Sequence, residues 1–491
     1  MAAKSEVEVL MGGKMRSMAL GIAAALALVA CATVSSTPDA PAVAEAARAR
    51  AGQQHPQILA AFGGEVTGPT SVYVKGVGEK IATAAGLPGR CTFSVIGSDV
   101  VNAFAVPGCY IYITRGLLAI MNSEDELASV LGHEVGHVVA DHSARRQNAS
   151  TLSGLGAIAV GVLTGSGELA QLAGQAAQVW TLSYSRDQEF ESDDLGVRYL
   201  FRAGYNPFAA ADMLDALGTN DALSAKTSNR QAGSEIPAWA RSHPLSADRV
   251  TRATAQAQAG GGVRGQPPEM TARYLAAIDG MIYGDDPEQG FVNGRTFAHP
   301  KLKIAFEAPT GFTLTNTPAA VNISGPNAKA QFAGGALPAE GLEAHARAVL
   351  AKLVGQSPVQ VGQTQRSTTN GLETVTLPAR AQAQSGQIVD ISVTAYRVGT
   401  SAYHFVGLAP QGQLGPLAPM LSSMRTLTDA QAAALRARVI DVVNVGPRDT
   451  VQTLAQRMAF DDFRVERFLA LNGLNANTPL PAQVKIVRYA S

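Results

Sequence analysis

His133, Glu134 and His137 form the pattern His-Glu-x-x-His, which is the most specific chemical signal in this sequence. Residues four apart on a helix share a face, with about 5 to 6 Å between their Cβ atoms, so the two imidazoles can converge on one zinc ion. Glu134 follows the first histidine and would lie beside the water that the metal activates, where its carboxylate can act as general base. The pattern predicts a hydrolase with one Zn2+ per chain.

A second helix, predicted over residues 178–202, is expected to supply the third ligand. On this helix Glu189 and Asp193 share one face, whereas Glu191 lies about 200° round from Glu189 and should point elsewhere. Glu189 completes a His, His, Glu set that leaves a fourth position open, as catalytic zinc sites do. Asp193 is expected to accept a hydrogen bond from a ligand histidine and fix its tautomer. The alternative is an exposed acidic face without a metal.

The positions of neighbouring elements follow from local signals. Ser123 and Glu126 form a capping box, which predicts that the helix carrying the two histidines begins there. Residues 91–114 have the apolar runs and turn signals of strands. His142 lies five residues past His137 and about 140° off the ligand face, so it is expected to be an ordinary exposed or capping histidine.

Composition excludes several classes of protein. The chain has 491 residues with Lys+Arg 39 and Asp+Glu 39, and this balance argues against nucleic acid as a partner. After the N-terminal segment no apolar run reaches the roughly 18 residues that a membrane-spanning helix needs, which excludes a polytopic membrane protein. The length predicts two to four domains, at about 100 to 200 residues each.

The N-terminus predicts export. Two basic residues precede an apolar stretch over residues 18–30 that ends at Cys31, so residues 1–31 are interpreted as a lipoprotein signal peptide. Cleavage before Cys31 and acylation of its thiol would anchor the protein to a membrane, and the residues that follow favour the inner leaflet of the bacterial outer membrane, facing the periplasm. An ordinary signal peptide is the alternative, and Met11 and Met15 are alternative start codons.

Changes in pattern divide the rest of the chain into four parts, and the predicted class is α+β multidomain. A flexible tether is expected first, then a mostly helical domain with a small sheet, then a small α+β sandwich and finally a short unit with two strands and two helices. The predicted bounds of these parts are 32–50, 51–285, 299–428 and 439–491.

Four motifs in this order resemble the signatures of peptidase family forty-eight of the metallo class, which includes HtpX, the CAAX prenyl endopeptidases and BepA-like periplasmic lipoproteins. The four are Asn102 to Gly108, His133 to His137, Glu189 to Asp193 and Ser242 to Pro244. The resemblance covers about Ile58 to Ala255 and implies a zincin-type (gluzincin) metalloprotease domain. The chain has no run of transmembrane helices and no repeat of about 34 residues, so it departs from the first two types and from the repeat module of the third.

The resemblance also implies roles for residues outside the histidine motif. In relatives, one strand is an exposed sheet edge to which the substrate backbone adds as a further strand. The matching residues here are Asn102, Ala103, Phe104 and Ala105. His243, with Arg249 six residues on, matches a histidine that either stabilises the tetrahedral intermediate or caps the zinc in a latent form. A plain turn histidine is the third option.

The C-terminal residues 439–491 resemble a LysM module, a βααβ unit that binds peptidoglycan glycan. Arg448 and Ala482 stand where such modules usually have glycine, and Arg448 lies in the loop expected to meet the sugar. Glycan binding and a role as a folded cap or protein contact therefore both stay open. The middle domain resembles no family. Three of its histidines are expected to be solitary surface or core residues: His299, His345 and His404.

Cys91 and Cys109 remain once Cys31 is acylated, and both fall in the strand region of an exported protein. Oxidation is permitted there, so the pair is either a disulfide or two small buried apolar residues.

The function expected from these patterns is zinc-dependent endopeptidase activity on unfolded or stalled proteins of the cell envelope. The competing class is a latent or weakly proteolytic chaperone tethered to the wall. A peptidoglycan amidase is a third hypothesis, which draws only on the LysM-like unit.

Overall fold

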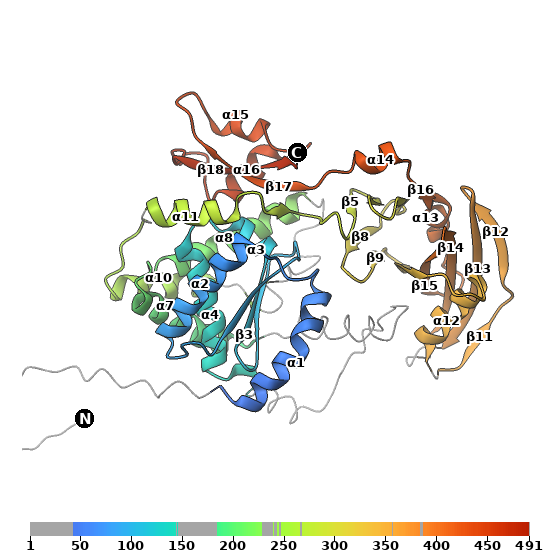
Figure 1. The fold of residues 1–491 in the computed structure, drawn as a ribbon, viewed down its shortest axis with the longest axis horizontal. Coiled ribbons are helices and arrows are strands. Elements are labelled where there is room, and N and C mark those ends of the chain that lie inside the picture. The colour runs from blue at the N-terminus through green and yellow to red at the C-terminus, as the bar shows by residue number, and fades with distance from the viewer. Residues whose placement is uncertain are drawn as a thin grey trace, which may run out of the picture. The chain divides into compact units, whose positions relative to one another are not determined.

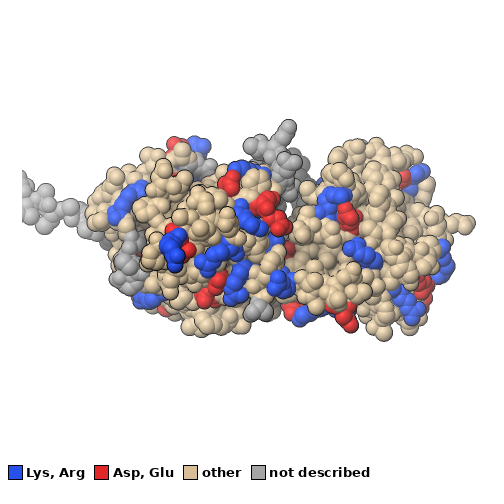
Figure 2. All heavy atoms as spheres, turned by 90° about the horizontal axis from the view of Figure 1, so that it is seen from above, with Lys and Arg blue, Asp and Glu red and all other residues tan. Residues whose placement is uncertain are grey.

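The structure is a computed structural model that describes residues 43–143, 145, 184–227, 239, 243–244, 247–265, 268–355, 357–382 and 386–490 (Figure 1). The predicted signal peptide, Cys31 and Ser242 lie outside the described residues. None of the helices described is both long and apolar enough to cross a bilayer. Figure 2 shows basic and acidic side chains interspersed over the face in view.

The first helix begins inside the predicted tether. Helix α1 (Glu45–Ala61) starts at Glu45, so the prediction of a flexible segment up to residue 50 was wrong at its end. The reason is packing: Ala51 and Ile58 of α1 are buried against Phe104 and neighbouring strand residues, which orders a segment whose sequence has little helical amphipathicity of its own.

The strand region predicted over residues 91–114 is confirmed as a small sheet. Its strands are β1 (Thr92–Ile96), β2 (Ala103–Val106) and β3 (Tyr110–Thr114). The order is β1-β3-β2, with β1 parallel and β2 antiparallel to β3, so β2 lies at an edge of this sheet within the described residues.

Helices cover this sheet and carry the candidate site. They are α2 (Pro69–Ala84), α3 (Arg115–Ile120), α4 (Glu124–Val139), α7 (Arg186–Ala203), α8 (Ala209–Thr227), α10 (Ala247–Ala259) and α11 (Pro268–Ile278). The predicted start of the histidine helix is confirmed, because the Ser123 hydroxyl accepts a hydrogen bond from the Glu126 backbone N–H at 3.1 Å. Helix α7 begins later than predicted: Ser185 and Gln188 form a capping box, and residues 184 and 185 are not helical.

The middle part is α+β, as predicted, but it begins earlier than residue 299. A four-stranded sheet of order β16-β7-β6-β5 contains β5 (Phe291–Asn293), β6 (Thr296–His299), β7 (Ile304–Glu307) and β16 (Arg425–Thr426). An eight-stranded sheet contains β8 (Thr313–Asn316), β9 (Val321–Ser324), β10 (Lys329–Ala336), β11 (Val359–Val361), β12 (Gln365–Thr369), β13 (Leu372–Gln382), β14 (Ile388–Val398) and β15 (Ser401–Pro410).

Alternation along β15 shows how the middle part is layered. Phe405 packs with Phe306 of the smaller sheet, whereas Val406 faces the core under α12 (Leu342–Val354). The remaining short helices are η1 (Gly415–Leu417), α13 (Ala418–Ser423) and α14 (Asp429–Ala433). The expectation that His345 and His404 act alone was wrong: His345 Nε2 lies 3.0 Å from His404 Nδ1, because β15 and α12 bring together residues distant in sequence.

The C-terminal part has the predicted strand, helix, helix, strand order. Its elements are β17 (Arg438–Asn444), α15 (Val451–Gln456), α16 (Arg464–Leu471) and β18 (Gln483–Tyr489). Strand β17 pairs with β18 and also with β4 (Ile282–Tyr283), which follows α11. The buried Lys485 ammonium donates to the carbonyls of Ala119 and Met121, so this unit shares a core with the helices around the sheet.

Helices α4 and α7 approach each other through glycines. A Cβ at Gly132 would lie 3.4 Å from the Gly196 Cα, and one at Gly136 would lie 2.7 Å from the Ser192 Oγ. The Ser192 hydroxyl donates to the His133 carbonyl and joins the two helix backbones. This close packing brings the backbones that carry the predicted ligands together.

Gly136→Ala should destabilise the protein by about 1 to 3 kcal/mol, because the new methyl group would overlap Ser192 and force the helices apart. Gly218→Ala is the matched control, since a Cβ at Gly218 in α8 meets nothing within 4 Å and alanine favours the helix. Thermal unfolding of both variants checks this. Equal melting temperatures for Gly136→Ala and Gly218→Ala would contradict it.

Cys91 and Cys109 form a disulfide in this structure, which decides between the two alternatives left by the sequence. Replacing both with alanine should lower the free energy of unfolding by about 3 kcal/mol, because the bond closes a loop across a sequence separation of 18 residues. Urea denaturation of the oxidised protein measures the difference. Reduced wild-type protein should lose a similar amount, and an unchanged midpoint in the double variant would contradict the prediction.

Candidate metal centre

Three separate segments supply the side chains of the site. Helix α4 presents His133, Glu134 and His137, and α7 presents Glu189. His243 lies before α10 and is joined to Trp239 by a backbone hydrogen bond of 2.7 Å. The prediction that residues of α4 and α7 would meet is therefore confirmed by the geometry, and His243 meets them as well.

The donor atoms of these side chains converge. One atom each from His133, His137, Glu189 and His243 lies within 4.8 Å of the others, and all four residues are buried. The two Nε2 atoms of His133 and His137 are 3.0 Å apart, and Glu189 places its oxygens 3.6 and 3.4 Å from them. A set of two imidazoles and one carboxylate matches the ligand choice of catalytic zinc proteins, so these residues fit a single divalent ion.

The electrostatics of the cluster favour a bound cation. Burial lowers the pKa of His137 well below its usual value, so its imidazole is neutral and keeps a lone pair. Burial opposes the charged form of Glu189, but the neighbouring His243, His137 and His133 outweigh it and hold the pKa of Glu189 well below its usual range. Glu189 is therefore an anion, with Arg249 Nη1 2.7 Å from its Oε2 and the imidazoles on its other side.

Glu134 faces the same space without a hydrogen bond among the described residues. Both of its carboxylate oxygens are buried. Burial raises the pKa of Glu134, although His243 and His133 act against this rise. Buried polar groups normally have partners, so an unpartnered carboxylate beside four converging donors fits a site that holds an ion and a water molecule.

His243 lies between the metal donors and Glu134. Its Nδ1 is 3.0 Å from Glu189 Oε1 and 3.2 Å from His133 Nε2, and its Nε2 is 3.6 Å from Glu134 Oε1. The ring stacks on Trp239, with centroids 4.4 Å apart and an interplanar angle of 24°. This placement excludes a plain turn histidine and is compatible with either of the two roles implied by the family resemblance.

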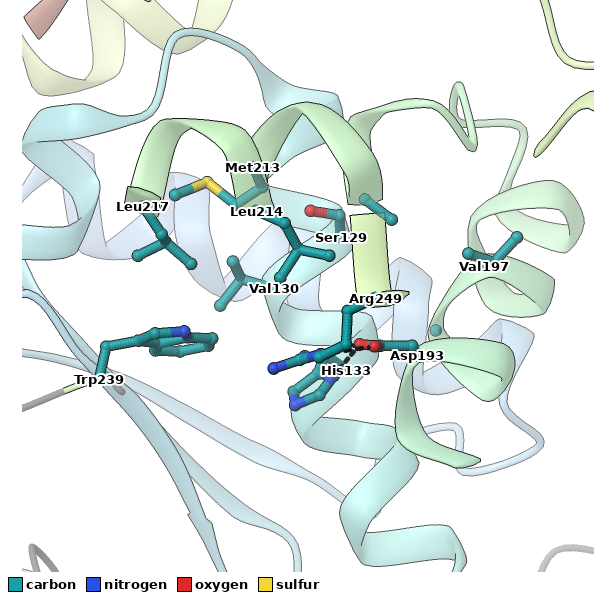
Figure 3. A pocket seen from close by; sticks show the side chains of 12 residues that line it. Ser129, Val130, His133, Asp193, Val197, Met213, Leu214, Leu217, Trp239 and Arg249 are labelled. Carbon is teal, nitrogen blue, oxygen red and sulfur yellow. Dashed lines mark hydrogen bonds and ion pairs between the residues drawn. The ribbon is translucent and has the colours of Figure 1, made fainter. Parts of the chain in front are cut away.

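The predicted outer contacts of His133 are present. Asp193 Oδ1 lies 2.9 Å from His133 Nδ1, and Arg249 donates to both Asp193 oxygens at 2.7 and 2.8 Å. Arg249 Nη1 also lies 2.7 Å from Glu189 Oε2. Figure 3 shows Arg249 and His133 meeting at Asp193, beside a cavity of about 30 Å³ that Trp239 lines. Arg249 thus contacts both Glu189, a predicted ligand, and Asp193, which meets the predicted ligand His133.

His142 was interpreted wrongly from the sequence, whereas the expected direction of Glu191 is confirmed. His142 is fully buried, and its Nδ1 lies 2.7 Å from Nδ1 of the ligand His137. Burial lowers the pKa of His142. The prediction for His142 assumed that the helix continues past His137 to His142. Helix α4 ends at Val139, and Asp141 adopts a positive φ of 49°, which turns the chain back. Glu191 does point away from the ligands, as expected, but its Oε2 lies 3.2 Å from His142 Nε2.

Tyr184 is a further residue near the site that the sequence gave no reason to select. Its ring stacks on His137, with centroids 3.8 Å apart and an interplanar angle of 15°. It lies just before the Ser185 cap of α7, so the cap that starts this helix also places the ring. The one sequence signal that could have pointed to Tyr184 is its position next to Ser185, the residue that begins the helix carrying Glu189.

The predicted edge strand is in place, but its side chains are not exposed. Asn102, Ala103, Phe104 and Ala105 are all buried. Phe104 packs between Phe62, which directly follows α1, and Tyr112 of β3, with ring centroids at 5.2 and 4.9 Å. The strand can therefore offer a ligand its backbone at the sheet edge rather than these side chains.

Two histidines and a glutamate around a shared centre, with a free carboxylate on the same His-Glu-x-x-His helix, define a metallopeptidase site of the zincin class. Residues 70–257 match the model of peptidase family M48, so this part of the chain is an M48 metallopeptidase domain. This confirms the resemblance drawn from the four motifs.

Several curated proteins are similar to part of this chain. The beta-barrel assembly-enhancing protease of Yersinia pestis is 29% identical over 227 residues, which cover 44% of each chain. The mitochondrial metalloendopeptidase OMA1 of Schizosaccharomyces pombe is 30% identical over 38% of this chain and 52% of its own. The metalloprotease YcaL of Escherichia coli is 29% identical over 38% of this chain and 71% of its own. The chain thus spans less than half of the first of these relatives.

Among solved structures, the solution structure of a cyanobacterial PsbP from Synechocystis covers 28% of this chain and 98% of its own. Its sequence identity is 11% and its TM-score 0.23.

Asp193→Ala should lower metal affinity about 10- to 100-fold, because His133 loses the acceptor that orients its ring. The buried Arg249 would also lose Asp193 and keep Glu189 as its carboxylate partner, which should destabilise the protein by about 1 to 3 kcal/mol. Chelator competition and thermal unfolding measure the two effects. Wild-type metal affinity in a folded Asp193→Ala protein would show that this contact does not tune the site.

Proposed function

We propose that this protein is a zinc-dependent endopeptidase that cleaves unfolded or stalled proteins of the bacterial cell envelope. The observation that carries the proposal is the convergence of four buried donors within 4.8 Å beside the unpartnered carboxylate of Glu134. The M48 match over residues 70–257 supports the reaction class.

The proposed roles follow from position. His133, His137 and Glu189 would hold one zinc ion, and bound zinc would supply a Lewis acid that polarises a peptide carbonyl and makes water more acidic. Glu134 would take the proton from the attacking water and return it to the leaving amine, since its oxygens make no hydrogen bond among the described residues. His243, 3.6 Å from Glu134, would stabilise charge on the substrate oxygen.

The substrate we propose is an extended polypeptide. Strand β2 has a partner on one side, β3, and its backbone on the other side can pair with an added strand. Because the side chains of β2 are buried, recognition would depend on backbone hydrogen bonds and would tolerate many sequences. Unfolded chains present such backbone, whereas folded proteins do not.

We also propose a location in the bacterial envelope. The support is the lipoprotein-like sequence ending at Cys31, which would anchor the chain to the inner leaflet of the outer membrane. A relative named beta-barrel assembly-enhancing protease is consistent with substrates from that membrane. Residues 439–491 would either contact peptidoglycan as a LysM-like unit or serve as a folded cap. Arg448, which stands in place of the usual glycine in the loop expected to meet glycan, is exposed.

A latent, weakly proteolytic binding protein is the second candidate. It is favoured by one observation, the 3.2 Å approach of His243 Nδ1 to His133 Nε2, which places His243 among the metal donors. His243→Ala separates the two candidates, because cleavage should fall if His243 acts on the substrate and rise if it blocks the metal.

Glu134→Gln should reduce casein cleavage by about 10²- to 10⁴-fold, because the amide cannot accept the proton. The zinc content should remain near that of the wild type, since Glu134 is not among the proposed ligands, whereas Glu189→Ala should lose the metal. Fluorescent casein digestion and metal analysis of the purified protein test both points. Undiminished cleavage by Glu134→Gln would end the hydrolase proposal.

A further inference from the structure

The second ring nitrogen of His137, Nδ1, makes a contact that has no role in the proposed reaction. Its Nε2 faces the other donors, and its Nδ1 lies 2.7 Å from His142 Nδ1. A hydrogen bond between two ring nitrogens needs one donor and one acceptor. A metal ligand keeps its lone pair on the coordinating nitrogen, so His137 must carry its proton on Nδ1 and His142 Nδ1 must accept it.

This assignment determines the state of His142 in turn. A neutral imidazole that accepts at Nδ1 holds its proton on Nε2. His142 Nε2 lies 3.2 Å from Glu191 Oε2, so a carboxylate stands where that proton needs an acceptor. Arg145 pairs with the same Glu191 oxygen, and Gln188 donates to the His142 backbone carbonyl at 3.3 Å. Both contacts hold the chain of hydrogen bonds in place.

We propose that His142 and Glu191 are positioning residues that fix the tautomer and ring orientation of His137 for the metal. Glu191 selects the tautomer of His142, and His142 selects that of His137. The inference rests on the proposed role of His137 as a metal ligand.

The two ligand histidines are thus held by different means. His133 is held by Asp193, a buried carboxylate enclosed by Arg249. His137 is held by a neutral ring, and the carboxylate one step further out is 46% exposed. The contacts of His133 with Asp193 and Arg249 are buried. The contacts of His137 with His142 and Glu191 end at a carboxylate on the surface of α7. Substitution of the buried His142 should therefore affect the metal more than substitution of Glu191.

The local backbone is what makes the contact available. Asp141 adopts a left-handed φ of 49°, which aspartate tolerates better than most residues. This turn directly after α4 returns His142 to the side of His137, although the helical period would place it elsewhere.

The test measures Zn2+ affinity of the full chain by chelator competition, together with the visible spectrum of the Co2+-loaded protein. His142→Ala should weaken Zn2+ binding about 10- to 100-fold and change the Co2+ spectrum, because His137 loses its acceptor. His142→Asn should recover part of the affinity, since the amide oxygen can accept the same proton. Glu191→Ala should weaken binding less than His142→Ala.

Asp194→Ala is the matched control. Asp194 lies on the same helix and pairs with Arg252, as Glu191 pairs with Arg145, but it does not contact a ligand histidine in the described structure. The affinity of the Asp194→Ala protein for Zn2+ should equal that of the wild type. The proposal is overturned if folded His142→Ala keeps wild-type affinity and spectrum. If His142→Ala does not fold, equal affinities of Glu191→Ala and Asp194→Ala overturn it.

This result can be separated from the failure of the proposed function, because no substrate is present. If Glu134→Gln still cleaves casein while His142→Ala loses zinc, the hydrolase proposal falls and the positioning role stands. If both proteins bind zinc as the wild type does and only Glu134→Gln is inactive, the positioning role falls alone.

Discussion

The close contact between α4 and α7 is the constraint on which the site depends. Glycines at 132, 136 and 196 let the two backbones approach, and the Ser192 hydroxyl joins them at the His133 carbonyl. In this structure the close approach brings Glu189 of α7 within 3.6 Å of the imidazoles of α4. The absence of side chains at these positions is thus as important to the centre as the histidines themselves.

The residues around the contact between α4 and α7 are arranged to pair buried charges. Glu189 and Asp193 are buried carboxylates, and each would be costly without compensation. Arg249 serves both, which ties the outer contact of one ligand to the position of another. Glu134 is the exception, because its oxygens make no hydrogen bond among the described residues and meet His243 Nε2 only at 3.6 Å. A buried carboxylate without a hydrogen bond, surrounded by paired charges, is expected in a catalytic centre and not in a structural one.

Much of the site could be predicted from local spacing. The four-residue interval between His133 and His137, and the same interval between Glu189 and Asp193, place each pair on one helix face whatever the rest of the fold does. The cap at Ser123 marks a helix start through side-chain contacts within three residues, whereas the cap at Ser185 was not used and the start of α7 was placed too early. Such signals depend only on neighbours in sequence, and the structure agrees with both intervals and with the cap at Ser123.

Other features were decided only by the tertiary structure. His142 was misplaced because a left-handed turn at Asp141 ends the helical period, and the partnership of His345 with His404 joins segments far apart in the chain. The start of α1 inside the expected tether has the same cause, since burial and not local propensity orders it. The sequence by itself determined the ligand types, their spacing and the reaction class that they imply. The partners of those ligands were decided by packing between distant segments, which no local periodicity encodes.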